Sequence, residues 1–101
     1  MTEISPAILK EWQQQETHFA LVDVRESYEH DAFNIGGQLI PLGELISRRN
    51  ELVRDKPVII YCEKGIRSMI AIQRLEELGF TNLYNLQGGM KAYRAANKIT
   101  F

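Results

Sequence analysis

Cysteine, histidine and long apolar runs are scarce in this sequence, and each scarcity excludes a class of protein. One cysteine among 101 residues cannot form a disulfide within the chain. The two histidines, His18 and His30, have no ligand residues around them in a metal-binding pattern, so we expect no metal site and no cofactor. No segment approaches the roughly 18 consecutive apolar residues that a membrane-spanning helix requires.

Charge of either sign is not in excess. Twelve lysines and arginines stand against 13 aspartates and glutamates, and the net charge of −1 gives no reason to expect a nucleic acid or an anionic membrane as partner. The opening Met-Thr-Glu-Ile-Ser-Pro lacks the basic and apolar regions of a secretion signal. We therefore expect a cytoplasmic protein with a free thiol, folded as one domain over residues 1–101, and make no prediction of its oligomeric state.

Alternating apolar and helical patterns predict the fold class. Apolar or β-branched runs predict five strands, at about residues 3–4, 19–24, 38–40, 58–61 and 82–86. Helical spacing predicts a first helix that begins at Pro6, helices at about residues 27–32 and 42–53, a fourth helix between the Cys62 loop and Gly79, and a last helix after Gly88-Gly89. Strands that alternate with helices, with continuous apolar runs in the central strands, indicate an α/β fold: a five-stranded parallel sheet flanked by helices on both faces.

Particular residues support three of these helices. Ser5-Pro6 is typical of an N-cap followed by proline in the first turn. Apolar stripes are predicted from Ile8, Leu9 and Trp12 in the first helix, and from Ala71, Ile72, Leu75 and Leu78 in the fourth. Gly79 suits the position after a helix end, and the apolar spacing over residues 42–53 begins just after Pro41.

The single cysteine, Cys62, stands at the end of the clearest predicted strand and just before a predicted helix. In open α/β sheets, ligands bind beyond the carboxyl ends of the strands. Unpaired backbone N–H groups and the positive end of the helix dipole would point toward this sulfur. Gly65 lets the loop curl, and Lys64 and Arg67 add positive charge. Together these features favour the thiolate over the thiol, and so a nucleophilic cysteine.

The plainer alternative is a cysteine that serves only as a small buried apolar residue, as most free cysteines do. A cysteine that only packs in the core does not require the lysine, glycine and arginine that follow Cys62. Asp23 and Arg25 also end a predicted strand on this side of the sheet, where they would brace the Cys62 loop through a buried ion pair or contact the substrate directly. His18 and His30 are expected to be surface residues or residues with satisfied hydrogen bonds.

Three segments of the sequence resemble the single-domain rhodaneses. Residues 62–68, Cys-Glu-Lys-Gly-Ile-Arg-Ser, are similar to their Cys-x-x-Gly-x-Arg-Ser active-site loop. Asp-Val-Arg-Glu at residues 23–26, with Tyr28-Glu29, is similar to a second family segment. Residues 75–80 and 82–89 are similar to the family's last third, so the resemblance covers about residues 5–95.

The resemblance implies a sulfurtransferase. Cys62 would accept a sulfane sulfur from a small donor such as thiosulfate, become a persulfide, and pass the sulfur to a thiophilic acceptor such as cyanide or a thiol. Arg67 would close the loop and add charge. The loop residues that would hold the outer sulfur are Glu63, Lys64, Gly65, Ile66 and Ser68. Thiosulfate releases sulfite as a stable anion, so the absence of a histidine beside Cys62 fits this chemistry.

Three other functions use some of the same residues. A phosphatase or arsenate reductase of related fold resembles Cys-x5-Arg, whereas four residues separate Cys62 from Arg67 here. A rhodanese-like module that only binds a partner commonly lacks the cysteine. A relay that accepts persulfide from a partner protein and passes it on would use the same residues as the transferase.

Overall fold

The five strands form one parallel sheet, as the sequence predicts. The computed structural model describes residues 1–15 and 18–99. The strands run in the order β1-β5-β4-β2-β3, and each neighbouring pair is parallel. Their bounds are β1 Glu3–Ile4, β2 Ala20–Asp23, β3 Gln38–Leu39, β4 Val58–Tyr61 and β5 Leu83–Leu86.

Three α-helices connect strands and a fourth follows β5, and α2 has the bounds that the sequence predicts. They are α1 Pro6–Gln14, α2 Ser27–Ala32, α3 Ile66–Glu77 and α4 Gly89–Ala96. The predicted helix over residues 42–53 is wrong, because this segment forms two short 3₁₀ helices, η1 Leu42–Glu44 and η2 Arg49–Glu51. A 3₁₀ turn also brings residues three apart to one side, so the spacing of Leu42 and Leu45 does not distinguish it from an α-helix.

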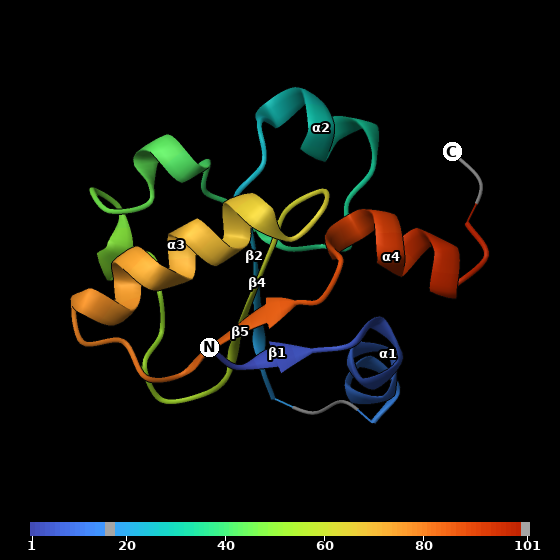
Figure 1. Ribbon diagram of the computed structural model, residues 1–101, viewed down its shortest axis with the longest axis horizontal. Helices are drawn as coiled ribbons and strands as arrows, with labels where there is room; N and C mark the ends of the chain where they lie inside the picture. Colours follow the sequence, from blue (N-terminus) through green and yellow to red (C-terminus); the bar gives the residue numbers. More distant parts are fainter. Residues whose placement is uncertain (16–17, 100–101) are drawn as a thin grey trace.

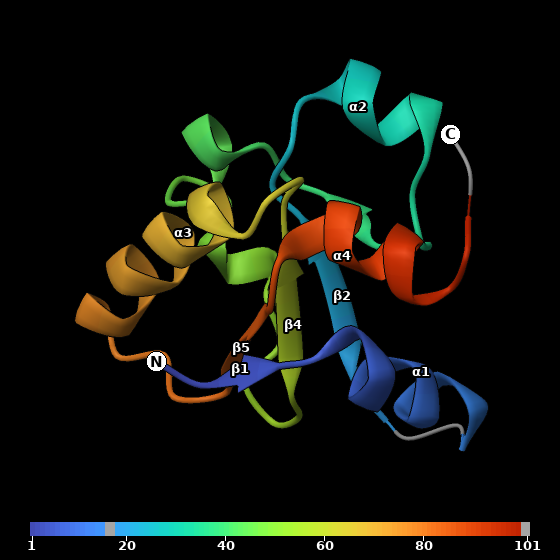
Figure 2. The same cartoon turned by 45° about the vertical axis from the view of Figure 1, so that its right-hand side comes forward.

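Helices cover both faces of the sheet, and β4 shows how its residues divide between them. Val58 and Ile60 belong to the apolar cluster under α3, whereas Ile59 and Tyr61 belong to the cluster under α1 and α4. Figures 1 and 2 show α3 on one side of the strands, α1 and α4 on the other, and α2 at the carboxyl ends of the strands. Burial on both faces accounts for the continuous apolar run of β4, which is fully buried.

Two residues of the predicted apolar stripes lie at the surface. Leu9, Ala71, Ile72 and Leu75 are buried, but Ile8 and Leu78 are more than 40% exposed. Leu78 is the C-cap that follows the last residue of α3, Glu77, and Gly79 comes next with φ +92, so Leu78 lies where the helix ends.

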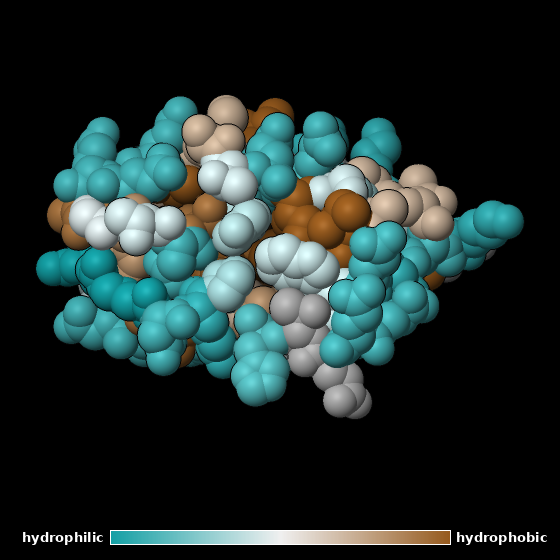
Figure 3. Space-filling view, turned by 90° about the horizontal axis from the view of Figure 1, so that it is seen from below, coloured by the Kyte–Doolittle hydropathy of each residue, from teal (hydrophilic) through white to brown (hydrophobic). Residues whose placement is uncertain are grey.

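The face at the amino ends of the strands carries mostly hydrophilic residues. Figure 3 looks toward this face, where a small apolar patch is surrounded by hydrophilic side chains. None of the helices in the described part of the chain is long and apolar enough to cross a membrane.

The N-cap of α1 gives a direct test of the local structure. Ser5 Oγ accepts a hydrogen bond from the amide of Ile8 at 3.1 Å. We expect Ser5→Ala to lower the free energy of unfolding by about 1 kcal/mol, measured by urea denaturation. Ser47→Ala is the matched control, because the Ser47 hydroxyl caps no helix amide and donates to the carbonyl of Glu44 on the surface. Equal losses in the two variants would contradict a capping role for Ser5.

Candidate active site

Cys62 lies where β4 ends, at the carboxyl edge of the sheet. Residues 62–65 form the loop between β4 and α3, which Figure 1 shows beside α2. Gly65 has φ +92 and is the N-cap of α3. Since only glycine adopts this conformation without strain, Gly65 allows the loop to turn directly into the helix.

Two backbone amides donate hydrogen bonds to the sulfur. The amide of Gly65 donates to Cys62 Sγ at 3.1 Å and the amide of Ser68 at 3.3 Å. Ser68 lies in the first turn of α3, where amides have no partner within the helix. The sulfur therefore accepts hydrogen bonds that the helix leaves unmade, at the positive end of the helix dipole. Both interactions favour negative charge on Sγ.

Contacts behind the loop turn its amides toward the sulfur. The amides of Met90 and Lys91, at the start of α4, donate to the carbonyls of Cys62 and Glu63, both at 2.9 Å. The side-chain amide of Asn85 donates to the carbonyl of Gly65 at 3.2 Å. With three carbonyl groups bound on the outer side, the loop presents N–H groups on its inner side.

Gly89 makes the contact with α4 possible. A side chain at this position would place its Cβ 2.5 Å from the Cys62 carbonyl oxygen and 2.6 Å from the Glu63 carbonyl carbon. The glycine also has φ +62. The Gly88-Gly89 pair, which the sequence places at the start of the last helix, thus lets α4 approach the nucleophile loop.

The Ser68 hydroxyl links the sulfur to Asn85. Ser68 Oγ lies 3.3 Å from Cys62 Sγ and donates to Asn85 Oδ1 at 2.5 Å. Because the hydroxyl has one hydrogen, it faces the sulfur with its oxygen and can accept the S–H of the neutral thiol. Ionisation of the sulfur would let the hydroxyl turn its hydrogen from Asn85 to Sγ.

Cys62 is buried, yet it borders a cavity. Cys62 is 1% exposed and contacts the apolar cluster under α3, as a core cysteine would. It also lines a cavity of about 260 Å³ together with Glu63, Lys64, Ile66 and Arg67. The cavity therefore places open space next to the Cys62 loop.

Arg67 binds a carboxylate of α2. Its two terminal nitrogens lie 2.7 and 2.8 Å from the carboxylate oxygens of Glu29. This pair raises the pKa of Arg67 further above its ordinary value and lowers the pKa of Glu29 to about 2. The guanidinium thus joins the first turn of α3 to α2 while it lines the Cys62 cavity.

Asp23 and Arg25 form a buried ion pair at the end of β2. Their side chains are 0% and 2% exposed, and the closest charged atoms are 3.0 Å apart. Burial disfavours the charged form of Arg25, but hydrogen bonding and the charge of Asp23 outweigh it and raise the pKa of Arg25. Arg25 also lies 3.4 Å from the carboxylate of Glu63, and His30 Nδ1 lies 2.9 Å from Asp23. The pair is therefore in direct contact with the Cys62 loop.

The negative charge of Glu63, the residue after Cys62, is balanced by two arginines. Its carboxylate forms ion pairs with Arg25 and Arg94, the second from α4. Two cations offset the repulsion that this carboxylate would otherwise exert on a thiolate.

The structure gathers all the predicted site residues at one edge of the sheet and adds others. Cys62, Arg67, Glu63, Lys64, Gly65, Ile66 and Ser68 lie in the loop and the first turn of α3, and Asp23 and Arg25 contact the loop. Sequence analysis missed the contributions of Glu29, His30, Asn85, Gly89 and Arg94. Of these, Glu29, Asn85 and Gly89 lie in segments that resemble the rhodaneses, which was a usable signal, whereas His30 and Arg94 lie outside those segments and gave none.

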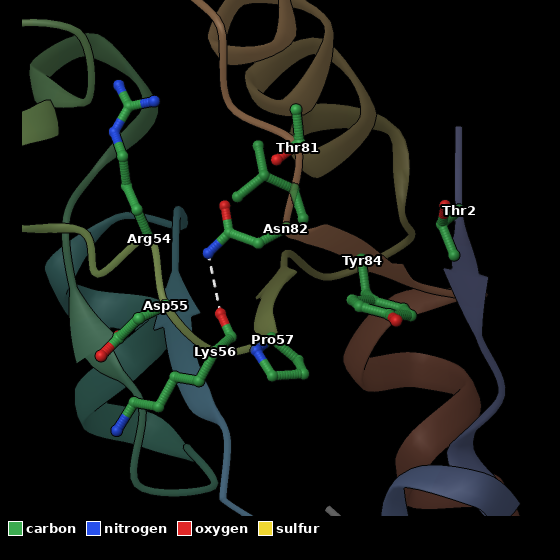
Figure 4. Close-up of a pocket in the computed structure, with 9 residues that line it drawn as sticks. Thr2, Arg54, Asp55, Lys56, Pro57, Thr81, Asn82 and Tyr84 are labelled. Atoms are coloured by element: carbon green, nitrogen blue, oxygen red, sulfur yellow. Dashed lines mark hydrogen bonds between the residues drawn. The ribbon is translucent and has the colours of Figure 1, made fainter.

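A different cavity, of about 310 Å³, lies at the amino ends of the strands. Figure 4 shows Tyr84, Pro57 and Asn82 around it, while the ends of the Arg54 and Lys56 side chains point away. The Asn82 side-chain amide is bound to the carbonyl of Lys56. No residue of the Cys62 loop lines this cavity, so it is separate from the candidate site.

Comparison with known proteins identifies the family. The rhodanese-like domain model matches residues 5–96. The chain belongs to the rhodanese-like domain family. A rhodanese-related protein of Thermoplasma volcanium has the same fold, with a TM-score of 0.85 and 30% identity over 95% of this chain and 93% of that one.

Two Bacillus subtilis relatives extend this comparison. The putative sulfurtransferase YtwF is 33% identical over 95% of this chain and 93% of its own length. The uncharacterised protein YqhL is 46% identical over 72% of this chain, which spans 59% of that relative's length. The rhodanese-like chain thus resembles relatives of similar length as well as parts of longer ones.

Substitution of Gly89 tests the close approach of α4 to the backbone of the Cys62 loop. We expect Gly89→Ala to lower the free energy of unfolding by about 3 kcal/mol, because the new Cβ meets loop backbone as well as an unfavourable φ. Gly79→Ala is the control: φ is +92 there, but nothing lies within 4 Å of the added Cβ, so only about 1 kcal/mol is expected. Equal losses by urea denaturation would show that α4 does not constrain the loop.

The Glu29–Arg67 pair makes stability depend on acid pH. The pKa of Glu29 is about 2 in the folded protein against 4.5 ordinarily, so its contribution is complete above the ordinary value and is lost as pH falls toward 2. We expect wild type to lose about 1 kcal/mol more than Glu29→Gln over this range, since Arg67 is partly exposed. The control is Glu76→Gln at an exposed position of α3. A Glu29→Gln profile parallel to wild type would contradict the assignment.

Proposed function

We propose that this chain is a sulfurtransferase in which the Cys62 thiolate accepts a sulfane sulfur, for example from thiosulfate, and passes it to cyanide or a thiol. The observation that carries the proposal is the environment of the sulfur, where the amides of Gly65 and Ser68 donate to Sγ at the amino end of α3. A cysteine packed only against hydrocarbon has no such donors. These donors stabilise the anionic sulfur, which is the form that attacks.

The reaction consists of two displacements at sulfur. First, an electron pair of the Cys62 thiolate forms a bond to the outer sulfur of thiosulfate, and the pair of the former S–S bond leaves with sulfite. Next, the acceptor attacks the outer sulfur of the persulfide and Cys62 leaves as a thiolate. Neither step requires a general acid or base, because both leaving groups are stable anions. This agrees with the position of His30, which contacts Asp23.

The remaining site residues hold the loop and the transferred sulfur. Gly65 and Ser68 supply amides, and the other loop residues, Glu63, Lys64 and Ile66, complete the wall around the outer sulfur. Arg67 adds positive charge beside it. Asp23 and Arg25 brace the loop through the ion pair of Arg25 with Glu63.

Two alternative functions, a partner-binding module and a phosphatase, fit the site less well than a sulfurtransferase. A module that only binds partners has no need of Cys62 and Arg67, or of a sulfur that accepts hydrogen bonds from two backbone amides. A phosphatase would need a wider loop for a tetrahedral oxyanion than four residues provide. We place the transferase in the cytoplasm, as one domain over residues 1–101 and without a cofactor, and a persulfide relay to a partner protein uses the same chemistry.

Intact-mass analysis after incubation with thiosulfate tests the function. We expect the protein to gain the mass of one sulfur atom, and cyanide to remove it. Cys62→Ser should gain nothing, because an alcohol is not ionised at neutral pH and does not attack sulfur. Circular dichroism of Cys62→Ser checks that the fold is retained.

The same measurement can reject the proposal. If thiosulfate and small-molecule persulfides leave the mass of the wild-type protein unchanged, the chain does not transfer sulfur and the partner-binding module becomes the better description. Hydrolysis of p-nitrophenyl phosphate without sulfur gain would instead favour the phosphatase.

A further inference from the structure

The side chains of Ser68 and Asn85 form an uncharged, buried pair next to the sulfur of Cys62. Asn85 lies in β5 on the same face as Leu83, which belongs to the apolar cluster under α3. Asn85 is 3% exposed and Ser68 is 0% exposed. Neither side chain takes part in the two displacements proposed above. An apolar side chain would suit this cluster, so packing alone does not explain why an amide is buried here.

The orientation of the Asn85 amide follows from its two partners. The carbonyl of Gly65 only accepts hydrogen bonds, so the nitrogen of the amide faces it, at 3.2 Å. The oxygen of the amide therefore faces Ser68 Oγ, 2.5 Å away. Because this oxygen also only accepts, the single hydrogen of the Ser68 hydroxyl points to Asn85 and not to Cys62.

This arrangement suits the neutral thiol better than the thiolate. Cys62 Sγ lies 3.3 Å from Ser68 Oγ, and the thiol can donate its hydrogen to that oxygen. A thiolate only accepts, so the hydroxyl either turns its hydrogen from Asn85 to Sγ or leaves an oxygen lone pair against the negative charge. When the hydroxyl turns, Asn85 Oδ1 loses the one hydrogen bond that it accepts from the described residues. Ionisation of Cys62 therefore has a cost at Asn85.

We infer that Asn85 is a positioning residue that opposes the ionisation of Cys62, by holding the Ser68 hydrogen until negative charge on Sγ draws it away. The inference rests on the proposed function and deepens it. Sγ is negative when it attacks thiosulfate and when it leaves the persulfide, and it is uncharged in the persulfide itself. The Ser68 hydroxyl thus donates to Sγ in the charged states and returns to Asn85 between them. An interaction made only where charge develops favours the reaction step over the resting state.

Charged side chains around Cys62 also act on its ionisation. Those that line its cavity, or form ion pairs with a residue that does, are Glu63, Lys64, Arg67, Arg25, Glu29 and Arg94. The substitutions that test the inference exchange one uncharged side chain for another. A change in ionisation therefore reports the hydrogen bonds of Ser68 and Asn85 and not a change in net charge.

A double-mutant cycle of Ser68→Ala and Asn85→Leu in the full chain tests the inference. The rate of alkylation of Cys62 by iodoacetamide is measured as a function of pH, and its midpoint reports ionisation because the thiolate is the form that reacts. We expect Asn85→Leu to shift the midpoint lower by about half a pH unit more when Ser68 is present than in the Ser68→Ala background, the size of one hydrogen bond. The lost bond to the Gly65 carbonyl is common to both backgrounds, so the cycle cancels it.

Asn82→Leu is the matched control. The side chain of Asn82 also donates to backbone carbonyls, those of Val53 and Lys56, but it lies just before β5, at the amino end of the strand. We expect Asn82→Leu to lower the free energy of unfolding and to leave the midpoint of alkylation unchanged. A midpoint that shifts as far as in Asn85→Leu would show that ionisation follows overall stability, and would overturn the inference. Urea denaturation checks that each variant is folded, and Asn85→Ala repeats the cycle with a side chain that needs no extra space.

Intact mass after incubation with thiosulfate separates the inference from the proposed function. If the effects of Ser68→Ala and Asn85→Leu on the midpoint simply add, the hydrogen of Ser68 is not shared and the inference fails, whereas sulfur gain by wild type still supports the transferase. If wild type gains no sulfur from any donor, the proposed function fails, and the cycle still decides whether Asn85 opposes ionisation.

Discussion

The hydrogen bonds from the loop amides to the sulfur of Cys62 are the interaction on which the rest of the site depends. They are supported from the opposite side of the loop, where α4 binds the carbonyls of Cys62 and Glu63, and Asn85 binds that of Gly65. A short loop cannot turn its N–H groups inward unless its carbonyls find partners elsewhere. The sheet supplies that support, since β4 and β5 are neighbours and α4 follows β5 directly.

Charges around the sulfur are arranged in pairs that tie separate elements to the loop. Glu63 is held by arginines from the end of β2 and from α4, and Arg67 is held by Glu29 of α2. Each pair offsets a charge that would otherwise be partly buried and unbalanced. These pairs hold the loop in place, so that the amides of Gly65 and Ser68 keep their directions toward the sulfur.

The sheet itself was predictable because its strands are buried on both faces and separated by clear turn residues. The bounds of α2 and β4 follow directly from the sequence, and so does the N-cap at Ser5. The segment 42–53 was not predictable, because apolar residues three apart fit a 3₁₀ turn as well as an α-helix. Exposure of Leu78 was missed because helical spacing places it on the apolar stripe, although it is the C-cap of α3 and lies at the surface.

The sequence by itself determined the nucleophile, the loop around it and the strand that delivers it, because these residues are consecutive and local geometry follows from their order. Only the tertiary structure decided what stands behind and around that loop. Asn85, Gly89 and Arg94 come from later elements, and their contacts with residues 62–65 arise because parallel strands bring their carboxyl ends to one edge. Side chains distant in sequence leave no local pattern, so the partners of Glu63 and Arg67 could be found only in three dimensions.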